Sequence, residues 1–331
     1  MYQINETKMI RAAKDALNPI KPAQSIFVEC MIFLLINLIC SIPQSIVTTV
    51  YTFIAMLTDP EYYKLIMSES TDANAIMEYV LKFAESIPTW LYAVILAASG
   101  FMIVAALVYC TRIQKRPAMS VGFGGRGVAS EYLLGLLIGA VMISVPAIAC
   151  GVSNCVTYTQ NTGVNPVMII IFLLAFVLQG MGEEALFRGC LMTSLARRYD
   201  PWVAILVSSV MFAIFHMGNP NFSLIAFVNI TLFGIFAGVF MMKRGSIWAV
   251  GAIHTIWNFM QSNVFGYNVS GNPKFDSIFT SENANFGAIL SGGDFGLEGG
   301  LGATVVLLIA ILAALLIPTK KSELCEGSSA N

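Results

Sequence analysis

The chain has 331 residues, of which 57% are hydrophobic and only 11% charged, and its net charge is −1. A soluble domain carries about 25% charged residues, so this composition excludes an ordinary soluble fold. The near-neutral charge also argues against nucleic acid as a partner. We therefore expect an integral membrane protein whose first partner is the lipid bilayer.

Eight segments approach the length of about 20 apolar residues that a helix needs to cross a bilayer. They are residues 26–56, 89–110, 132–152, 166–187, 202–216, 223–242, 246–263 and 300–317. The first contains Pro43, which predicts a kink or an interfacial stretch. The predicted fold class is all-α: a polytopic membrane helix bundle with about eight transmembrane helices.

The charges of the loops support this number of spans, because cytoplasmic loops are enriched in Lys and Arg. Every second loop of this chain is basic. The basic segments are the N-terminus, residues 112–126, 197–198, 243–244 and 320–321, and the other loops hold only Lys64, Lys82 and Lys274. This alternation predicts that both termini are cytoplasmic.

Two polar loops are expected on the opposite side of the membrane. Residues 58–88 are acidic, and a surface helix is expected over about 73–86. Residues 264–299 are rich in Gly, Asn and Ser and are too polar to cross the membrane.

Two adjacent glutamates, Glu183 and Glu184, continue an apolar helix. A charge inside a span costs several kcal/mol unless it is paired or hydrated, so such residues indicate function. Arg188 lies four residues after Glu184 and shares its helix face. We expect Arg188 to hold Glu184, which leaves Glu183 free to act.

The two histidines of the chain are both inside predicted spans. His216 lies four residues after Phe212, and His254 lies four residues before Asn258, so each pair shares a helix face. Glu183 and His216 flank the turn at Asp200 by 17 and 16 residues. Antiparallel helical arms would place both at one depth, about 25 Å from the turn. Glutamate and histidine away from water are effective acid–base partners.

These residues form three motifs, Glu183-Glu184-x-x-x-Arg188, Phe212-x-x-x-His216 and His254-x-x-x-Asn258. In this order and on successive spans they resemble the motifs of the CPBP family of intramembrane proteases. That family includes the type II CAAX prenyl endopeptidases and the Abi-type proteins of bacteriocin processing and self-immunity. The likeness runs from about residue 166 to 300. It implies an N-terminal membrane region over 1–130, a protease core over 131–320 and a polar tail over 321–331.

The resemblance implies an intramembrane glutamic endopeptidase, a peptide hydrolase. By position, Glu183 and His216 would activate a water molecule, and His254 and Asn258 would stabilise the oxyanion. Glu184, Arg188 and Phe212 would support them. The residue types suit this chemistry, because water attack on an amide needs a base and donors aimed at the developing charge.

The requirement for a metal is the main open point of mechanism. Glu183, His216 and His254 could bind zinc with one position left open. The chain contains no HExxH motif, and Asn258 is a better hydrogen-bond donor than zinc ligand. We expect a mechanism without a metal cofactor.

Two other functions use the same residue types. A proton-coupled transporter also places carboxylates and histidines inside the membrane, and a non-catalytic immunity or scaffold protein could keep the family fold. For a protease, the resemblance allows membrane-associated substrates, either lipidated or carrying a leader peptide. The expected location is a bacterial plasma membrane. The basic turns favour access from the cytoplasm, whereas the turn that follows His216 favours the outer face.

Overall fold

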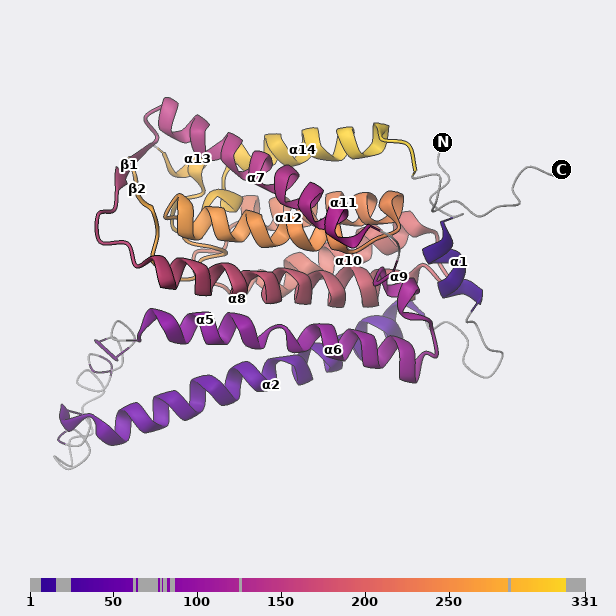
Figure 1. Ribbon diagram of the computed structural model, residues 1–331, viewed down its shortest axis with the longest axis horizontal. Coiled ribbons are helices and arrows are strands. Elements are labelled where there is room, and N and C mark those ends of the chain that lie inside the picture. Colours follow the sequence, from indigo (N-terminus) through magenta and orange to yellow (C-terminus); the bar gives the residue numbers. More distant parts are fainter. Residues whose placement is uncertain are drawn as a thin grey trace.

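The chain folds into a bundle of long helices that lie alongside one another, with two short strands at one end (Figure 1). In this computed structural model the described residues are 7–15, 25–61, 64, 77, 79, 82–83, 87–124, 127–284 and 287–319. The strands mark one end of the bundle, and α1 (Lys8–Asp15) and α9 (Thr193–Leu195) lie at the other (Figure 1). We call these the strand end and the α1 end.

The long helices run between these two ends. They are α2 (Ile26–Thr58), α5 (Thr89–Ala98), α6 (Phe101–Val108), α7 (Val128–Val152), α8 (Pro166–Glu184), α10 (Pro201–His216), α11 (Leu224–Arg244), α12 (Trp248–Phe259) and α14 (Leu301–Leu316). Shorter helical elements are η2 (Tyr109–Ile113), η3 (Ala118–Val121), η4 (Ala185–Met192), η5 (Met260–Val264), α13 (Ala288–Ser291), η6 (Gly293–Phe295) and η7 (Leu297–Gly299).

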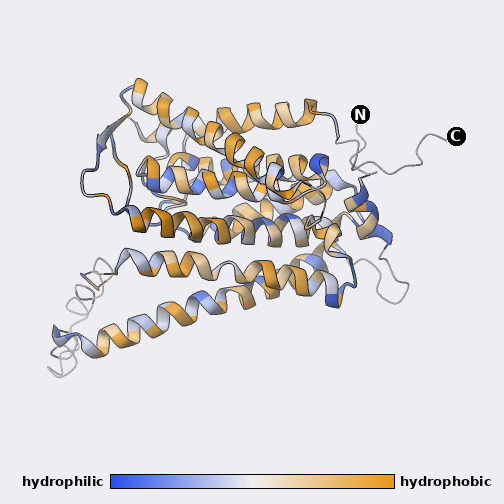
Figure 2. Ribbon diagram, in the orientation of Figure 1, coloured by the Kyte–Doolittle hydropathy of each residue, from blue (hydrophilic) through white to orange (hydrophobic). Residues whose placement is uncertain are grey.

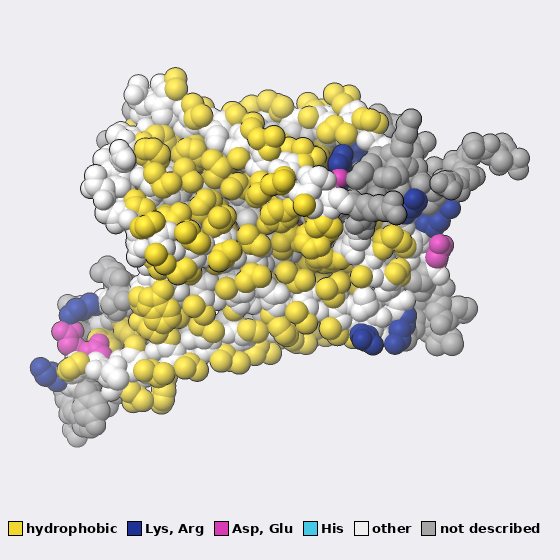
Figure 3. Space-filling model, in the orientation of Figure 1, with side chains coloured by type: hydrophobic (Ala, Val, Ile, Leu, Met, Phe, Trp, Pro, Cys, Tyr) yellow, Lys and Arg dark blue, Asp and Glu magenta, His cyan; other side chains and the backbone are white. Residues whose placement is uncertain are grey.

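Hydrophobic residues make up most of the long helices, as the orange ribbons of Figure 2 show, and hydrophobic side chains cover much of the face drawn in Figure 3. On α7, Leu133, Leu137 and Val141 repeat every four residues and are each more than half exposed. A face of this kind is stable against lipid and costly in water. The prediction of an all-α helix bundle integral to a membrane is therefore confirmed.

Within the described residues, five helices are long and apolar enough to cross a membrane. They are Ile26–Thr58, Thr89–Ile113, Val128–Val152, Pro166–Leu195 and Leu224–Arg244. The shorter apolar helices α10 and α14 have 16 residues each. The prediction of eight crossings with both termini in the cytoplasm remains a prediction.

Three local features refine the expected elements. Helix α2 continues through Pro43, and the second expected span divides at Ser99 and Gly100 into α5 and α6. The polar loop over residues 264–299 contains a strand that the sequence did not indicate. β2 (Phe279–Asn283) pairs antiparallel with β1 (Val156–Gln160), with Tyr158 opposite Ser281. The surface helix expected over 73–86 falls largely outside the described residues.

Helix α12 occupies the centre of the bundle, between α7 and α8. Glycines allow this close approach, as small residues commonly do between membrane helices. A Cβ atom at Gly180 of α8 would lie 2.8 Å from the backbone nitrogen of Thr255 in α12. One at Gly135 of α7 would overlap the carbonyl oxygen of Ala249. A backbone atom cannot move aside as a flexible side chain can. These glycines therefore determine how closely α12 approaches α7 and α8.

The N-terminal helices pack against this core. Helix α2 contacts α5, and α5 contacts α8. The buried Arg116 donates hydrogen bonds to Thr193 Oγ1 at 2.8 Å and Ser194 Oγ at 3.2 Å, which joins the segment after α6 to α9. The division of the chain at residue 130 remains a prediction.

Candidate active site

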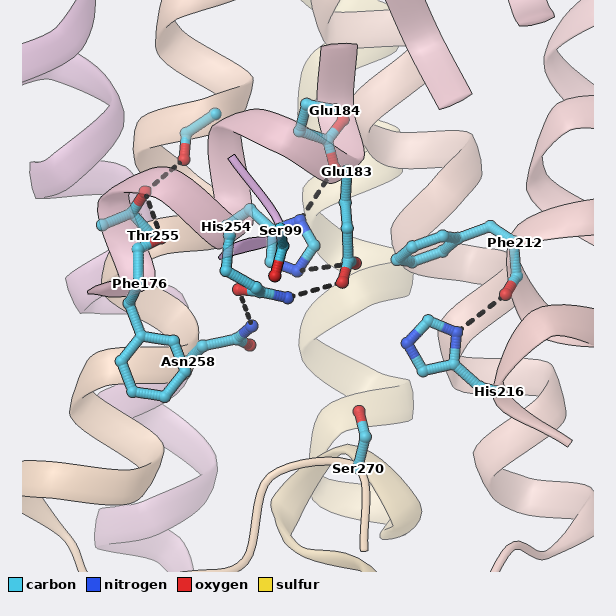
Figure 4. A network of polar contacts seen from close by, with 12 residues as sticks. Ser99, Phe176, Glu183, Glu184, Phe212, His216, His254, Thr255, Asn258 and Ser270 are labelled. Carbon is cyan, nitrogen blue, oxygen red and sulfur yellow. Dashed lines mark hydrogen bonds and ion pairs between the residues drawn. The ribbon is translucent and has the colours of Figure 1, made fainter. Parts of the chain in front are cut away.

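A cavity of about 390 Å³ lies inside the bundle. Its walls include all four of the residues predicted to be catalytic: Glu183, His216, His254 and Asn258. Glu183 is at the end of α8, His216 is the last residue of α10, and His254 and Asn258 lie on α12. In Figure 4, Glu183 extends between His254 on one side and the Phe212–His216 pair on the other. The tertiary structure thus brings the three motifs to one space.

The two glutamates sit where α8 changes from an α-helix to the π-helical segment η4. Such wider turns are frequent at functional sites. Because the glutamates are adjacent, their side chains leave the helix in different directions. Glu184 is completely buried, whereas Glu183 lines the cavity and retains a side-chain exposure of 16%. The structure thus separates the two side chains, and the roles of Glu183 and Glu184 remain predictions.

Glu184 is held by two partners through one oxygen. Its Oε1 accepts a hydrogen bond from Nη1 of Arg188 at 3.0 Å and lies 2.9 Å from Nδ1 of His254. A carboxylate only accepts, so Nδ1 of His254 carries the proton of that bond. The bond fixes the ring orientation and directs Nε2 of His254 toward Glu183, whose Oε2 lies 3.7 Å away. Partner groups of this kind commonly orient a functional histidine.

Aromatic rings complete the surroundings of Arg188. Its Nε and Nη2 atoms make no hydrogen bond to any described residue, although the side chain is completely buried. The guanidinium carbon lies 4.3 Å from the centre of the Phe212 ring and about 6 Å from the rings of Phe187 and Phe233. A cation over an aromatic face is stabilised by the ring quadrupole. Phe212 therefore supports the site by covering the charge that neutralises Glu184.

Gln179 links Glu183 to Asn258, a connection that the sequence reasoning missed. Its Nε2 donates to Oε1 of Glu183 at 2.6 Å, and its Oε1 accepts from Nδ2 of Asn258 at 3.0 Å. Gln179 lies four residues before Glu183 in an otherwise apolar stretch of α8. The same four-residue spacing that indicated Arg188 could have indicated Gln179.

His216 is oriented by the backbone of its own helix. Its Nδ1 lies 2.8 Å from the carbonyl oxygen of Phe212, so Nδ1 is the donor and Nε2 is left to accept a proton. The imidazole packs edge-on against the Phe212 ring, with 4.7 Å between centroids. The hairpin spacing predicted one depth for Glu183 and His216, and both side chains do line this cavity.

The loop over residues 264–299 supplies part of the cavity wall, which the sequence did not indicate. Ser270, Asn272, Phe275 and Glu298 all line it. Oε1 of Glu298 accepts hydrogen bonds from the backbone N–H of Ser270 and, at 2.6 Å, from its hydroxyl. Burial raises the pKa of Glu298, and the hydrogen bonds from Ser270 oppose that rise. No periodic pattern marked these residues, because the loop is irregular.

Zinc remains an alternative ligand of the site. Within the described residues, no three His, Cys, Asp or Glu side chains gather in an arrangement that could hold a metal ion. One nitrogen of His254 is already engaged by Glu184. The expectation of a mechanism without a metal cofactor stays a prediction.

Comparison with known proteins gave one result that bears on this site. Residues 165–260 match the family described as type II CAAX prenyl endopeptidase Rce1-like. This segment includes α8, α10, α11 and α12, and with them every residue of the three motifs. A search of curated proteins found no match. Through the segment that carries its site, the chain is similar to the Rce1-like family of type II CAAX prenyl endopeptidases.

Proposed function

We propose that the protein is an intramembrane endopeptidase in which Glu183 activates the water molecule that attacks the peptide bond. The family match supports a CAAX-type membrane protease in general terms. The observation that carries the more specific proposal is the position of Glu183. Its carboxylate lines the cavity beside His254, while the neighbouring Glu184 is completely buried.

Glu183 has the surroundings of a general base. One oxygen accepts a hydrogen bond from Gln179, and the other lies near His254. In the proposed reaction, the carboxylate takes a proton from water while the water oxygen attacks the carbonyl carbon. A base held within hydrogen-bond reach of water contributes about 10²–10⁴-fold to such a step. About half of the residues that line the cavity are apolar, and a site with little water strengthens this effect.

The charges of the site balance when His254 is protonated. Glu183 and Glu184 carry two negative charges, and Arg188 supplies one positive charge. A protonated His254 supplies the second and can donate from both ring nitrogens. Nδ1–H then points to Glu184, and Nε2–H points toward the space next to Glu183. This neutral group of four is less costly to bury than any arrangement with an uncompensated charge.

Nε2–H of His254 and the amide of Asn258 are the proposed oxyanion donors. Asn258 uses one N–H to contact Gln179 and has a second N–H to donate. Removing one such donor from a hydrolase costs about 2.7–4 kcal/mol of transition-state stabilisation. His216 would help Glu183 to activate the water. Its accepting Nε2 would then take the proton that Glu183 removed from water and pass it to the nitrogen of the leaving amine as the C–N bond breaks.

The proposed substrates are membrane-associated peptides or proteins, including lipidated chains and precursors with a leader peptide. A site enclosed by membrane helices favours a substrate that is itself attached to the bilayer. The proposed location is a bacterial plasma membrane, with bacteriocin or similar precursors as one substrate class. These assignments extend the family resemblance to this chain.

The test compares the wild type with Glu183→Gln and a matched control, Glu282→Gln. The amide introduced by Glu183→Gln can still accept the bond from Gln179 but cannot act as a base, whereas Glu282 is an exposed residue of β2. Each protein would be purified in membrane mimetics and incubated with a panel of membrane peptides, and mass spectrometry would detect new termini.

We expect cleavage by the wild type and by Glu282→Gln, and a loss of about 100-fold or more in Glu183→Gln, as expected for removal of a general base. Equal cleavage by all three would refute the role of Glu183. Rescue of a cellular phenotype by Glu183→Gln would favour the non-catalytic partner.

A further inference from the structure

The cavity extends from the middle of the bundle toward one of its ends, and this position bears on the source of the substrate. Helix α5 begins at the strand end, and the residues of α5 and α6 that line the cavity lie between 92 and 102. Helix α11 contributes Asn229, Ile230 and Phe233, all from its first half, and α10 contributes residues from its last turns. The stretches of α10 and α11 are the halves of their helices nearer the strand end. By contrast, α8 and η4 contribute residues between 176 and 187, farther from that end, and α2 contributes Asn37 and Gln44 from its middle part. The cavity therefore extends from the middle of the bundle toward the strand end.

The loops that line the cavity all belong to the strand end. Asn219 follows α10, and the remaining loop residues lie between α12 and α14. Among the described residues, no part of the cavity wall comes from the turns at the α1 end, which are residues 109–124, 193–200 and 243–247.

The cavity reaches the surface at the strand end. Of the side chains that line it, Asn272 is the exposed one, whereas the others are buried or half-buried. Asn272 lies in the loop that continues to β2. A substrate in water or at the membrane surface would therefore meet the cavity from this side.

Basic side chains distinguish the two ends. At the α1 end the described residues include Lys8, Arg11, Lys14, Arg112, Lys115, Arg116, Arg197, Arg198, Lys243 and Arg244, and at the strand end they include Lys64, Lys82 and Lys274. The dark blue side chains of Figure 3 show the group beside α1 and the smaller group around the loop after α2. Membrane proteins retain their Lys- and Arg-rich loops in the cytoplasm. The α1 end is therefore the cytoplasmic end.

From these two observations we infer that the cavity opens to the extracytoplasmic face, and that the substrate is a peptide segment presented on that face. An exported peptide or the outer segment of a membrane-anchored chain fits this class. A C-terminus that remains in the cytoplasm does not, because the turns at the cytoplasmic end contribute no described residue to the cavity. The inference about substrate rests on the proposed protease function, whereas the orientation of the cavity does not.

The orientation can be tested by cysteine labelling. Asn272→Cys places a thiol at the mouth of the cavity, and Lys274→Cys is a second exposed position in the same loop should the first variant fold poorly. Arg198→Cys is the control at the α1 end, where the residue is also exposed. Spheroplasts of a bacterial host would be treated with a membrane-impermeant maleimide before or after permeabilisation, with the wild type as the baseline for native cysteines.

We expect label on Asn272→Cys and Lys274→Cys in intact spheroplasts, and label on Arg198→Cys only after permeabilisation. The opposite pattern would overturn the inference. This measurement needs no enzymatic activity, so its outcome is independent of the proposed function.

The substrate side is tested with a peptide library fused to a single transmembrane helix and displayed on either face. We expect cleavage that depends on Glu183 in the extracytoplasmic display. Cleavage confined to the cytoplasmic display would overturn the substrate assignment. Absence of cleavage in both displays, with Asn272→Cys labelled from outside, would refute the proposed function and leave the orientation established.

Discussion

Nδ1 of His254 lies 2.9 Å from Oε1 of Glu184, and that same oxygen accepts a hydrogen bond from Arg188. The second glutamate of the motif therefore does more than pair with the arginine of its own helix. It also orients the histidine of α12, 70 residues away in the chain. Replacement of Glu184 should therefore mainly affect the stability of the protein, and replacement of Glu183 should mainly affect its activity.

Glu184→Gln should unfold the protein more readily than Glu183→Gln. Removing one partner of a buried ion pair costs about 3–5 kcal/mol, because the other charge is left uncompensated. Glu183 accepts its hydrogen bond from the uncharged amide of Gln179, and His254 can release its proton when Glu183 loses its charge. Replacement of Glu183 by Gln should therefore reduce activity with a smaller loss of stability. Thermal unfolding in detergent micelles would compare the two variants. A larger stability loss in Glu183→Gln would contradict the arrangement described.

Gln179→Leu should lower kcat by roughly tenfold, which corresponds to the loss of about 1.4 kcal/mol of hydrogen bonding. Gln179 connects the proposed base to a proposed oxyanion donor, so its effect should not add to that of Asn258→Ala. A double-mutant cycle on kcat measures this coupling. Strict additivity would show that the amide bridge has no part in the reaction.

Gly180→Ala should reduce both stability and activity. The added Cβ would lie 2.8 Å from the backbone of Thr255, so α8 and α12 would have to separate, and Glu183 would move away from His254. Gly163→Ala is the matched control, because the nearest atom to a Cβ there is 3.6 Å away. Unfolding temperature and cleavage rate should fall in the first variant and stay unchanged in the second. Wild-type behaviour of Gly180→Ala would mean that the two helices have room to spare.

Glu298 should give the stability a dependence on pH. Folding raises the pKa of this carboxyl above its usual 4.5, so the folded protein binds the proton more tightly than the unfolded chain. The stabilising contribution is complete below the unfolded pKa and is lost as pH rises through the folded pKa. The difference in Tm between wild type and Glu298→Gln should therefore fall as the pH rises above about 4.5, the usual pKa of this carboxyl. A constant difference above that pH would contradict the raised pKa.

Removal of metal ions should leave the activity unchanged. A water molecule activated by Glu183 needs no metal, whereas zinc held by Glu183, His216 and His254 would be essential. Activity before and after treatment with EDTA or phenanthroline distinguishes the two mechanisms. Loss of activity that zinc restores would replace the glutamate mechanism by a metal-dependent one.

The sequence by itself determined the membrane-embedded helical architecture and the motif residues. Both depend on local patterns: the length of apolar runs, and polar side chains spaced by one helical turn. Glu184 and Arg188 could be paired in this way because a helix brings residues four apart together whatever surrounds it. His216 and the carbonyl oxygen of Phe212 are also four residues apart on one helix, so their contact has the same local cause.

Only the tertiary structure decided which residues meet across helices. The contact of His254 with Glu184, the bridge from Asn258 through Gln179 to Glu183, and the arrival of Glu298 in the cavity join segments far apart in the chain. Such contacts depend on how closely and in what rotation helices pack, which here depends on glycines such as Gly180 whose role appears only in the packed bundle. The side on which the cavity opens follows from the same packing, because sequence spacing gives the depth of a residue along its own helix but not the walls that surround it.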